Sequence, residues 1–367
     1  MDRERVIVKT SIIGIITNVF LAGFKAAVGI ISGSIAVTMD AVNNLSDALS
    51  SVITIVGAKL AGKSPDKKHP LGYGRIEYLS SMMVAAIVLY AGITAFVESV
   101  KKIINPVEAE YSAVSITIIA VAIVVKLVLG KYVKTQGEKV KSGALIASGS
   151  DASFDAVLSA SVLLSAIIFM VFDLSLEAYV GVIISVFIIK AGFEMMSETL
   201  DDILGKRPDA ELGKKIKSLI ASEPEIRGAY DLFINDYGPN RYYASIHIEL
   251  PDTMHVDEVD RITRKVEKKV YDETGIALVA VGVYSYNTGN DEAAKLRNRV
   301  MEIVLNHDWA IQLHGFYADV ENKYMRFDTV ISFAITAREA VKTLTDELHE
   351  VYPDYEITIA PDVDLAD

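Results

Sequence analysis

Two pairs of polar residues interrupt long apolar runs in the N-terminal half of the chain. Asn43 and Asp47 lie in DAVNNLSDALSS, and Asp151 and Asp155 lie in SGSDASFDAVLSAS. Residues four apart share one face of a helix, so each pair presents two oxygen ligands in one direction. Ionisable groups at membrane depth are costly and usually mark a transport path, and a bound cation would offset the three carboxylates. The pairs therefore predict a four-ligand cation site between two membrane helices.

Other polar residues near these pairs have simpler explanations. Small polar side chains in membrane helices often only join neighbouring helices, which we expect of the nearby serines. Asp40 lies three residues before Asn43 on roughly the same face and is a weaker candidate for an entrance or supporting ligand. Lys126 and Lys190 also fall within apolar segments, and we expect each to lie close enough to a helix end to reach the membrane surface.

The distribution of apolar residues predicts a membrane half. Hydrophobic residues make up 51% of the 367 residues and crowd into residues 10–199. Six segments there can each reach the roughly 20 residues that a membrane helix needs. They are residues 10–31, 35–61, 77–104, 112–133, 143–171 and 175–199. We therefore predict an all-α bundle of six transmembrane helices.

Basic residues predict the orientation of this bundle. They precede the first segment and lie between the second and third and between the fourth and fifth, whereas the turns SGS and FDLSLE contain none. Both termini should then be cytoplasmic, in a multi-pass protein of the cell (plasma or inner) membrane. The charged start MDRERVIVKT leads into a long apolar run without a small-residue cleavage site, so we expect a retained helix and no signal peptide.

The sequence after residue 200 reads as charged and soluble, with an internal repeat. Residues 211–285 read as helix, strand, strand, helix, strand, and residues 291–361 repeat this order after the polar link YNTGNDE. Each repeat predicts a small α+β sandwich with helices on one face of a sheet. Three domains are expected: the membrane domain at 1–200, a cytoplasmic α+β domain at 201–287, and a second, apparently duplicated module at 288–367.

Composition argues against several functional classes. The net charge of −12 argues against a nucleic-acid partner. The chain has no cysteine, which excludes disulfides, thiolate metal sites and cysteine nucleophiles. It has no G-x-x-x-x-G-K-[ST] loop, so we do not expect an ATP-driven pump. No arrangement of nucleophile and base suggests an enzyme.

These features together resemble the cation diffusion facilitators over residues 1–287. The resemblance rests on NNLSD in the second segment, DASFD in the fifth, and the loop HPLGYGRIEYL after the second. It implies a dimeric metal-ion/proton antiporter with six transmembrane helices and a cytoplasmic α+β, ferredoxin-like domain. It also implies that the transported ion binds to Asn43, Asp47, Asp151 and Asp155. A homodimer in the lipid bilayer would then exchange a divalent metal for protons, without a prosthetic group.

Other metal sites of that family are incomplete in this sequence. A loop site of some zinc-transporting members corresponds to Asp66, His69 and Tyr73, where tyrosine replaces a ligand. Of the histidines expected at the cytoplasmic dimer interface, only His247 remains. Asp66, His69 and His247 are therefore weaker metal candidates. We expect His69 to shape its loop and His247 to be a packed or interface residue.

The second soluble module extends beyond the usual length of the family. It could enlarge the dimer interface, bind a partner or act as a sensor. His307, Asp308, His314 and the terminal PDVDLAD offer candidate ligands. Scattered surface polar residues are the simpler interpretation of all of them.

The ligand types bear on which ion is transported. Zinc-transporting members place a histidine at the first position of one or both pairs, where this chain has Asn43 and Asp151. One amide and three carboxylates suit Mn²⁺ better than Zn²⁺, which favours nitrogen and sulfur ligands. The pattern also resembles the manganese-exporting bacterial branch. Fe²⁺ and Co²⁺ are close alternatives, Zn²⁺ and Na⁺ stay open, and Mg²⁺ is disfavoured because it keeps its waters.

The same residues predict how transport is driven. Three carboxylates around one point cannot all stay ionised in an empty site, so a bound cation should displace protons. We therefore expect a metal/proton antiporter that exports a divalent cation, preferably Mn²⁺, from the cytoplasm by alternating access. A membrane-anchored ligand or metal sensor that acts through the soluble repeat is the alternative, and in it the buried oxygens would be structural.

Overall fold

The computed structural model describes most of the chain. The described residues are 3–32, 35–105, 113–172, 177–206, 209–239 and 241–362. Several helical side chains within these ranges, those of Asp40 and Asn43 among them, lie outside the described part. The chain divides into two compact units, one formed by the first six helices together with Tyr237–Pro239, and one formed by the elements that follow.

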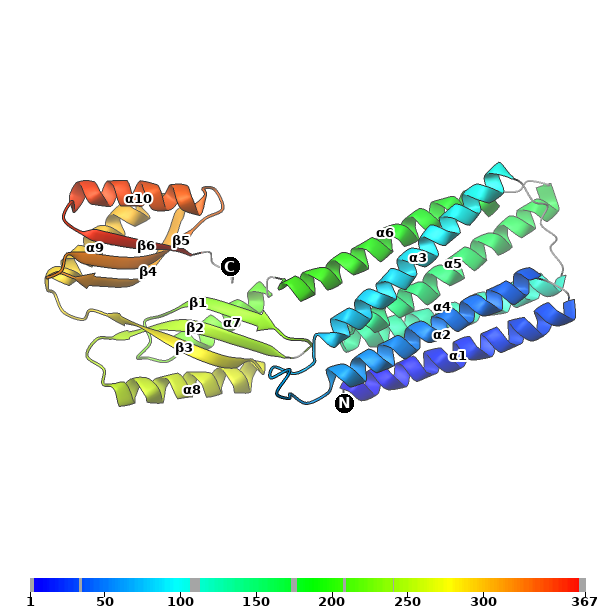
Figure 1. The fold of residues 1–367 in the computed structure, drawn as a ribbon, viewed down its shortest axis with the longest axis horizontal. Coiled ribbons are helices and arrows are strands. Elements are labelled where there is room, and N and C mark those ends of the chain that lie inside the picture. The colour runs from blue at the N-terminus through cyan, green and yellow to red at the C-terminus, as the bar shows by residue number, and fades with distance from the viewer. Residues whose placement is uncertain are drawn as a thin grey trace. The chain divides into compact units, whose positions relative to one another are not determined.

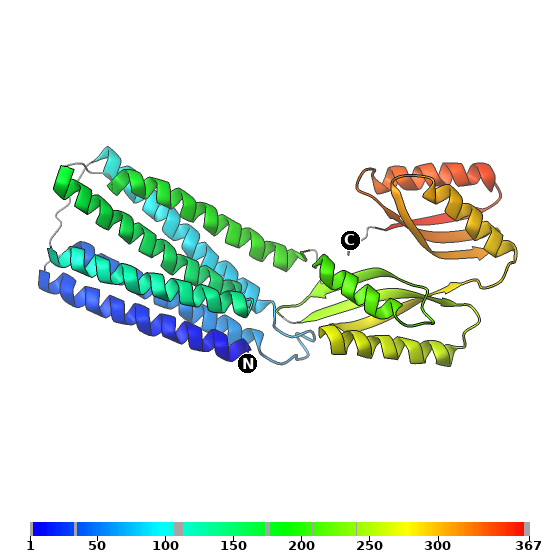
Figure 2. The same cartoon turned by 180° about the vertical axis from the view of Figure 1, so that it is seen from behind.

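Long helices that run side by side build the first unit (Figure 1), and the view from behind in Figure 2 shows the same arrangement. They pack chiefly as α1 with α2, α3 with α6, and α4 with α5. In the described part of the chain they are α1 (Arg3–Ser32), α2 (Ile35–Ala61), α3 (Ile76–Ile104), α4 (Ala113–Lys139), α5 (Gly143–Phe172) and α6 (Glu177–Leu204).

Three segments of these helices are long and apolar enough to cross a membrane, judged by length and composition within the described residues. They are Arg3–Val28, Ile76–Ile104 and Ala178–Leu204, which belong to α1, α3 and α6. The other three helices, α2, α4 and α5, carry charged residues near their middles, namely Asp47, Lys126 and Asp155. A total of six membrane spans therefore stays a prediction.

Glycines bring α4 and α5 into direct backbone contact. A Cβ added at Gly149 would lie 2.5 Å from the backbone nitrogen of Lys134 and 2.9 Å from the carbonyl oxygen of Gly130. A Cβ added at Gly130 would in turn lie 2.9 Å from the carbonyl oxygen of Gly149. Such small-residue contacts allow membrane helices to approach closely. We refer to Gly130 and Gly149 as the glycine seam.

A partly buried ion pair lies at one end of the helical unit. The guanidinium of Arg3 donates to both carboxylate oxygens of Glu77, each at 2.6 Å, and Glu77 is 3% exposed. Arg3 also donates to the carbonyl oxygens of Val140 and Lys141, at 2.7 and 3.0 Å. Bidentate pairing of a guanidinium with a carboxylate is among the stronger polar contacts in proteins. It ties the start of α1 to α3 and to the turn between α4 and α5.

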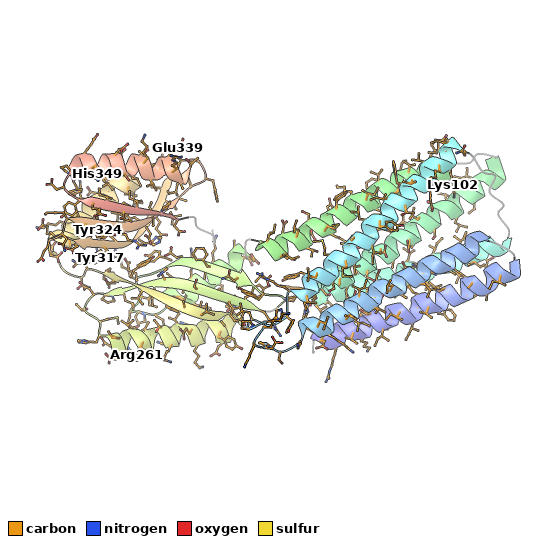
Figure 3. The ribbon with its side chains drawn as sticks, in the orientation of Figure 1. Lys102, Arg261, Tyr317, Tyr324, Glu339 and His349 are labelled. Carbon is orange, nitrogen blue, oxygen red and sulfur yellow. The ribbon has the colours of Figure 1, made fainter. Side chains whose placement is uncertain are left out.

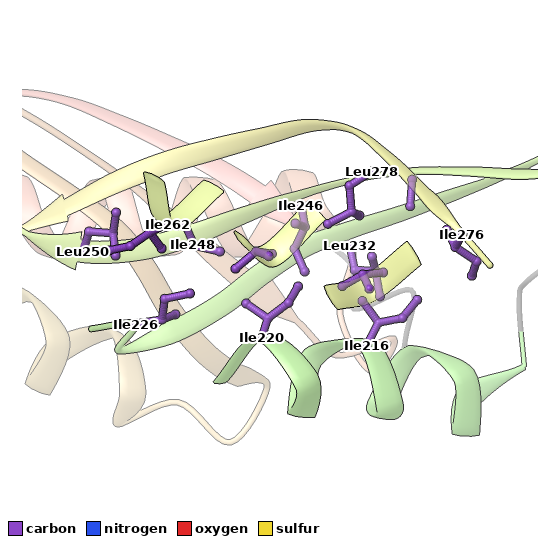
Figure 4. Close-up of a cluster of buried hydrophobic side chains, with 13 residues drawn as sticks. Ile216, Ile220, Ile226, Leu232, Ile246, Ile248, Leu250, Ile262, Ile276 and Leu278 are labelled. Atoms are coloured by element: carbon purple, nitrogen blue, oxygen red, sulfur yellow. The ribbon is translucent and has the colours of Figure 1, made fainter. Parts of the chain in front are cut away.

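The second unit begins with a three-stranded sheet covered by two helices. The elements are α7 (Ala210–Ala221), β1 (Gly228–Asp236), β2 (Tyr242–Pro251), α8 (Val256–Thr274) and β3 (Ala277–Tyr286). Strand β2 is central, antiparallel to β1 and parallel to β3. Alternate strand residues point to the same face, and one face packs against α7 and α8. Figure 4 shows this core, which includes Ile216, Ile246 and Ile262.

A second sheet follows with the same order of elements. These are α9 (Glu292–Leu305), β4 (Ala310–Asp319), β5 (Tyr324–Ile331), α10 (Ala337–Val351) and β6 (Glu356–Asp362). Strand β5 is central, antiparallel to β4 and parallel to β6. Met325, Phe327 and Leu344 lie in its core. Polar residues such as Arg261 on α8 and His349 on α10 are exposed on the outer faces of their helices (Figure 3). That the second module is a duplicate of the first stays a prediction.

Replacing Gly149 by Ala should lower the Tm of the full-length protein in detergent, because the new methyl group would collide with backbone atoms of α4. Overpacking of this kind typically costs about 1–3 kcal/mol of stability. Gly23→Ala on α1 is the matched control, since nothing lies within 4 Å of a Cβ added there. Equal Tm values for the two variants, measured by thermal unfolding, would contradict a tight contact between α4 and α5.

Candidate functional site

The sequence-predicted ligands lie on two helices of the first unit. Asn43 and Asp47 belong to α2, and Asp151 and Asp155 belong to α5. Asp151 is 6% exposed. The three carboxylates are close enough for Asp151 to interact electrostatically with both Asp47 and Asp155. The structure thus brings the three acidic residues together, while the side chains of Asn43 and Asp40 lie outside its described part.

Lys126 joins the two helices at this point. It extends from α4, and its ammonium group donates to Oδ2 of Asp47 and, at 2.7 Å, to Oδ2 of Asp155. Its side chain is 4% exposed, compared with 15% for Asp47 and 35% for Asp155. An ammonium carries three N–H donors, so it can satisfy both carboxylates at once. The centre of the predicted cation site therefore holds a cation that belongs to the protein itself.

The prediction that Lys126 reaches the membrane surface is wrong. It lies midway along α4, which spans 27 residues, so each end of the helix is about 20 Å away at 1.5 Å per residue. A lysine side chain cannot cover that distance. The midpoint position was visible in the sequence, but the partners of the lysine depend on how the helices pack. Lys190 is different: its side chain is 72% exposed and lies 3.5 Å from Glu194.

A second buried lysine also acts on the site. Lys25 on α1 is 3% exposed and interacts electrostatically with Asp47. Sequence reasoning did not single it out, although a lysine in the apolar run of the first segment was a visible signal. The site thus combines acidic side chains from α2 and α5 with basic side chains from α1 and α4.

The charge balance of the inner group suggests what it can bind. Asp47, Asp151 and Asp155 contribute three negative charges when ionised, and Lys126 contributes one positive charge. Two negative charges remain among these four residues, and Lys25, which interacts with Asp47, offsets part of them. The group can therefore accept further positive charge. Carboxylate oxygens are ligands for hard divalent ions, and an uncompensated charge buried in an apolar environment is costly. The arrangement can therefore hold either the ammonium of Lys126 or an incoming metal ion against Asp47 and Asp155.

Asp66 and His69 lie away from this centre, in the loop between α2 and α3. Asp66 accepts hydrogen bonds from the Tyr73 hydroxyl at 2.6 Å and from the backbone N–H groups of Lys68 and His69 at 3.0 and 2.8 Å. These bonds, the Tyr73 bond foremost, hold the pKa of Asp66 well below its usual range. His69 Nδ1 lies 3.7 Å from the same carboxylate. Asp66 thus serves as the hydrogen-bond acceptor that shapes the loop, and metal binding there stays a prediction.

His247 lies on β2 in the second unit. Its Nδ1 is 2.8 Å from Oδ2 of Asp231, and its side chain is 40% exposed. Its ring stacks on that of Tyr284, with ring centres 4.6 Å apart. His247 is therefore a half-exposed residue in contact with an acidic and an aromatic neighbour.

Comparison with known families covers both units. The sequence model described as the cation efflux transmembrane domain matches residues 11–204, more than half of the chain. The model described as the cytoplasmic domain of cation efflux proteins matches residues 208–283. Both matches end before α9, so the second soluble module lies beyond them.

Individual relatives are similar at low identity. An uncharacterized transporter of Methanocaldococcus jannaschii, MJ0449, is 28% identical over 72% of this chain and 94% of its own length. The manganese efflux system protein MneP of Bacillus subtilis is 23% identical over 73% of this chain and 92% of its own length. The magnetosome protein MamB of Paramagnetospirillum magneticum is 23% identical over 68% of this chain and 84% of its own length.

The helical unit that carries the acidic cluster coincides with the first family match, and the sheet of β1–β3 lies within the second. The chain therefore belongs to the cation efflux family, the cation diffusion facilitators, whose members are membrane-embedded metal transporters and not enzymes.

Proposed function

We propose that this protein exports a divalent metal ion from the cytoplasm in exchange for protons, and that Mn²⁺ is its preferred ion. The observation that carries the proposal is the meeting of Asp47, Asp151 and Asp155 around the buried ammonium of Lys126. Intramembrane ionisable groups are costly and typically line ion pathways. The similarity to MneP, named as a manganese efflux protein, supports the metal and the direction.

Lys126 has a specific part in this proposal, which is to take the place of the cargo when the site is empty. Its ammonium binds the same carboxylates that an incoming cation would use. A metal ion must therefore displace it, and the competition lowers the affinity of the site. Weaker binding favours turnover, because a transported ion has to leave as well as enter. When the ion departs, Lys126 can return and limit the repulsion between the carboxylates.

Proton exchange follows from the same charge balance. After a divalent ion leaves, the three carboxylates outnumber the ammonium groups of Lys126 and Lys25 that act on them, so negative charge stays uncompensated in an apolar environment. Protons entering from the outside would neutralise these carboxylates, and neutral carboxyl groups are less costly to bury than charged ones. The coupling of metal export to proton entry needs no further cofactor.

Selectivity in this proposal comes from the ligand atoms. Asp47, Asp151 and Asp155 offer only carboxylate oxygens, and we propose the amide of Asn43 as the fourth ligand, one helical turn from Asp47. Oxygen ligands suit Mn²⁺ better than Zn²⁺ and discriminate weakly against Fe²⁺ and Co²⁺.

We also propose how the chain is organised in the membrane. Helices α1–α6 span it six times with both termini in the cytoplasm, as the distribution of basic residues predicts. The proposed domains are residues 1–200, 201–287 and 288–367. The match to the cytoplasmic domain of cation efflux proteins supports a homodimer.

The ion pairs of Lys126 also favour a second candidate function. If these ion pairs never break, the acidic residues serve only to hold α2, α4 and α5 together. The membrane half would then anchor a soluble sensor. Removing one partner of a buried ion pair is strongly destabilising. Variants of a purely structural cluster should therefore lose stability. Transport measurements on variants of the site separate the two candidates.

Asp47→Asn and Asp155→Asn should each abolish metal-driven proton flux in reconstituted vesicles, because each removes a ligand charge. The flux should be measured separately with Mn²⁺, Zn²⁺, Fe²⁺, Co²⁺ and Na⁺. Glu194→Gln is the control, since Glu194 is 62% exposed and distant from the cluster in sequence. Flux in the two Asp variants equal to that of the control would favour the sensor.

Lys126→Met should tighten Mn²⁺ binding by roughly tenfold, or about 1.4 kcal/mol, because the metal no longer competes with the ammonium. Calorimetric titration of the full-length protein in detergent measures the Kd. Lys190→Met, which removes an exposed lysine from α6, should leave it unchanged. Weaker binding in Lys126→Met would mean that the lysine holds the carboxylates in their binding geometry instead of competing for them.

Asp151→His should shift transport toward Zn²⁺ relative to Mn²⁺, because an imidazole replaces a carboxylate at the first position of the second pair. The ratio of the two metal-driven fluxes in vesicles is the measurement, with the unsubstituted protein as reference. An unchanged ratio would show that site geometry or ion hydration, and not ligand type, sets the preference.

A further inference from the structure

The two sheets of the second unit each have one face that the helices leave uncovered, and these faces meet. On β4, Leu313 belongs to the core with α9 and α10, so His314 points to the opposite face. On β2, Ile246 and Ile248 belong to the core with α7 and α8, so His247 points away from them. The ring of Tyr230 on β1 stacks on that of His314, with centres 4.6 Å apart. Side chains of both modules therefore share one interface.

A cluster of metal-ligand side chains lies at this interface. Asp231 on β1, His314 on β4 and Asp328 on β5 each offer a ligand atom, and these atoms all lie within 4.8 Å of one another. His314 Nε2 lies 2.9 Å from Oδ1 of Asp231. His314 is 2% exposed and Asp328 is 7% exposed. The sequence-based interpretation of His314 as a scattered surface residue is therefore wrong.

Tyr284 can satisfy only one of the two carboxylates of this cluster. Its hydroxyl oxygen lies 2.8 Å from Asp231 Oδ2 and 2.7 Å from Asp328 Oδ2. A phenol has only one proton, so it can donate to only one of these two carboxylates at a time. The other oxygen of Asp328 is buried without a hydrogen bond, and its nearest ionic partner, Arg326, is 3.8 Å away. Asp328 is thus a buried acidic group whose hydrogen bonding is incomplete, next to a second acidic group, Asp231.

The backbone at Asp231 is also unusual. Asp231 has a φ of 53°, in the left-handed region, and lies at an irregularity in the pairing of β1 with β2 between Tyr230 and Phe233. Bulges of this kind re-aim a side chain, and such conformations gather at functional sites. Burial raises the pKa of Asp231, but hydrogen bonds from His247, His314 and Tyr284 outweigh it and hold that pKa well below its usual range.

We propose that Asp231, His314 and Asp328 bind one divalent cation of the first transition row, with His247 as the fourth ligand. Two carboxylates and two imidazoles form a neutral complex with such an ion, and this donor set suits Zn²⁺, Mn²⁺ or Fe²⁺. Ligands about 2.1 Å from a tetrahedral ion lie about 3.4 Å from one another, so small side-chain rotations suffice. The half-exposed His247 provides the entry side.

The consequence of this site is a metal-dependent link between the two soluble modules. Two ligands come from β1 and β2 of the first module, and two come from β4 and β5 of the second. An ion bound by both modules stabilises their contact, because metal binding adds its free energy to the docked state. The second module thereby responds to cytoplasmic metal, and the site does not depend on whether the membrane half transports Mn²⁺.

The test uses the full-length protein carrying Asp47→Asn and Asp155→Asn, so that the membrane site cannot contribute. After removal of metal with a chelator, this protein is titrated with Zn²⁺ and with Mn²⁺ in a calorimeter, and bound metal is counted after desalting. We expect one ion per chain. Adding Asp328→Asn or His314→Gln should weaken binding by roughly a hundredfold or more, because a ligand is lost.

The matched control is His307→Gln in the same module. His307 Nε2 also lies 2.9 Å from a carboxylate, that of Glu347, but this pair forms no part of the three-residue cluster. It should leave the affinity unchanged. If His314→Gln lowers the Tm of the metal-free protein, His247→Gln replaces it, since His247 is half-exposed and its substitution should still weaken binding.

Hydrogen–deuterium exchange supplies an independent readout. Metal should slow exchange in β4 and β5 of the background protein and leave exchange unchanged after Asp328→Asn. Absence of a bound ion in the background protein, or equal affinity in the Asp328→Asn and His307→Gln variants, would overturn the site and would indicate a cluster of ion pairs only. Neither outcome bears on transport, which is measured in vesicles with the membrane site intact.

Discussion

Burying charge among apolar helices is the constraint on which the helical unit depends. Two basic residues of this unit each pair with acidic groups on other helices. Lys126 on α4 binds Asp47 on α2 and Asp155 on α5, and Arg3 on α1 binds Glu77 on α3. A buried charge without such a partner costs several kcal/mol. The ion pairs therefore help decide which helices pack together and in what register, and the proposed cation site is built from the same acidic residues.

Local patterns made much of the helical unit predictable. Apolar length located the helices, with bounds that differ from the observed ones by up to seven residues, as at the start of α1. The four-residue spacing identified Asp47, Asp151 and Asp155, which the structure brings together. The position of Lys126 could not be interpreted in the same way. Its partners lie 79 and 29 residues away in sequence, and no periodicity within α4 reveals which neighbouring helix a side chain faces. Helix packing supplies that information.

In the soluble half, too, the sequence did not predict contacts between residues that lie far apart along the chain. Alternation and amphipathic spacing predicted the order of strands and helices in both modules, because these patterns are local. The contact between the modules is not local: Asp231 and His314 are 83 residues apart. Each residue alone looks like an ordinary polar position on a strand. Only the meeting of two sheet faces turns them into neighbours.

The glycine seam of α4 and α5 has a mechanical consequence. Where large side chains separate two helices, rotamer changes let the helices slide or tilt by small amounts. At Gly149 the backbones of the two helices meet directly, and at Gly130 only the short Ser153 side chain and backbone atoms of α5 lie against the glycine, so little side-chain volume separates the helices. These two helices should therefore move as one rigid body. A movement that exposes Asp155 first to one side of the membrane and then to the other would take place at the contacts of this body with α1, α2, α3 and α6.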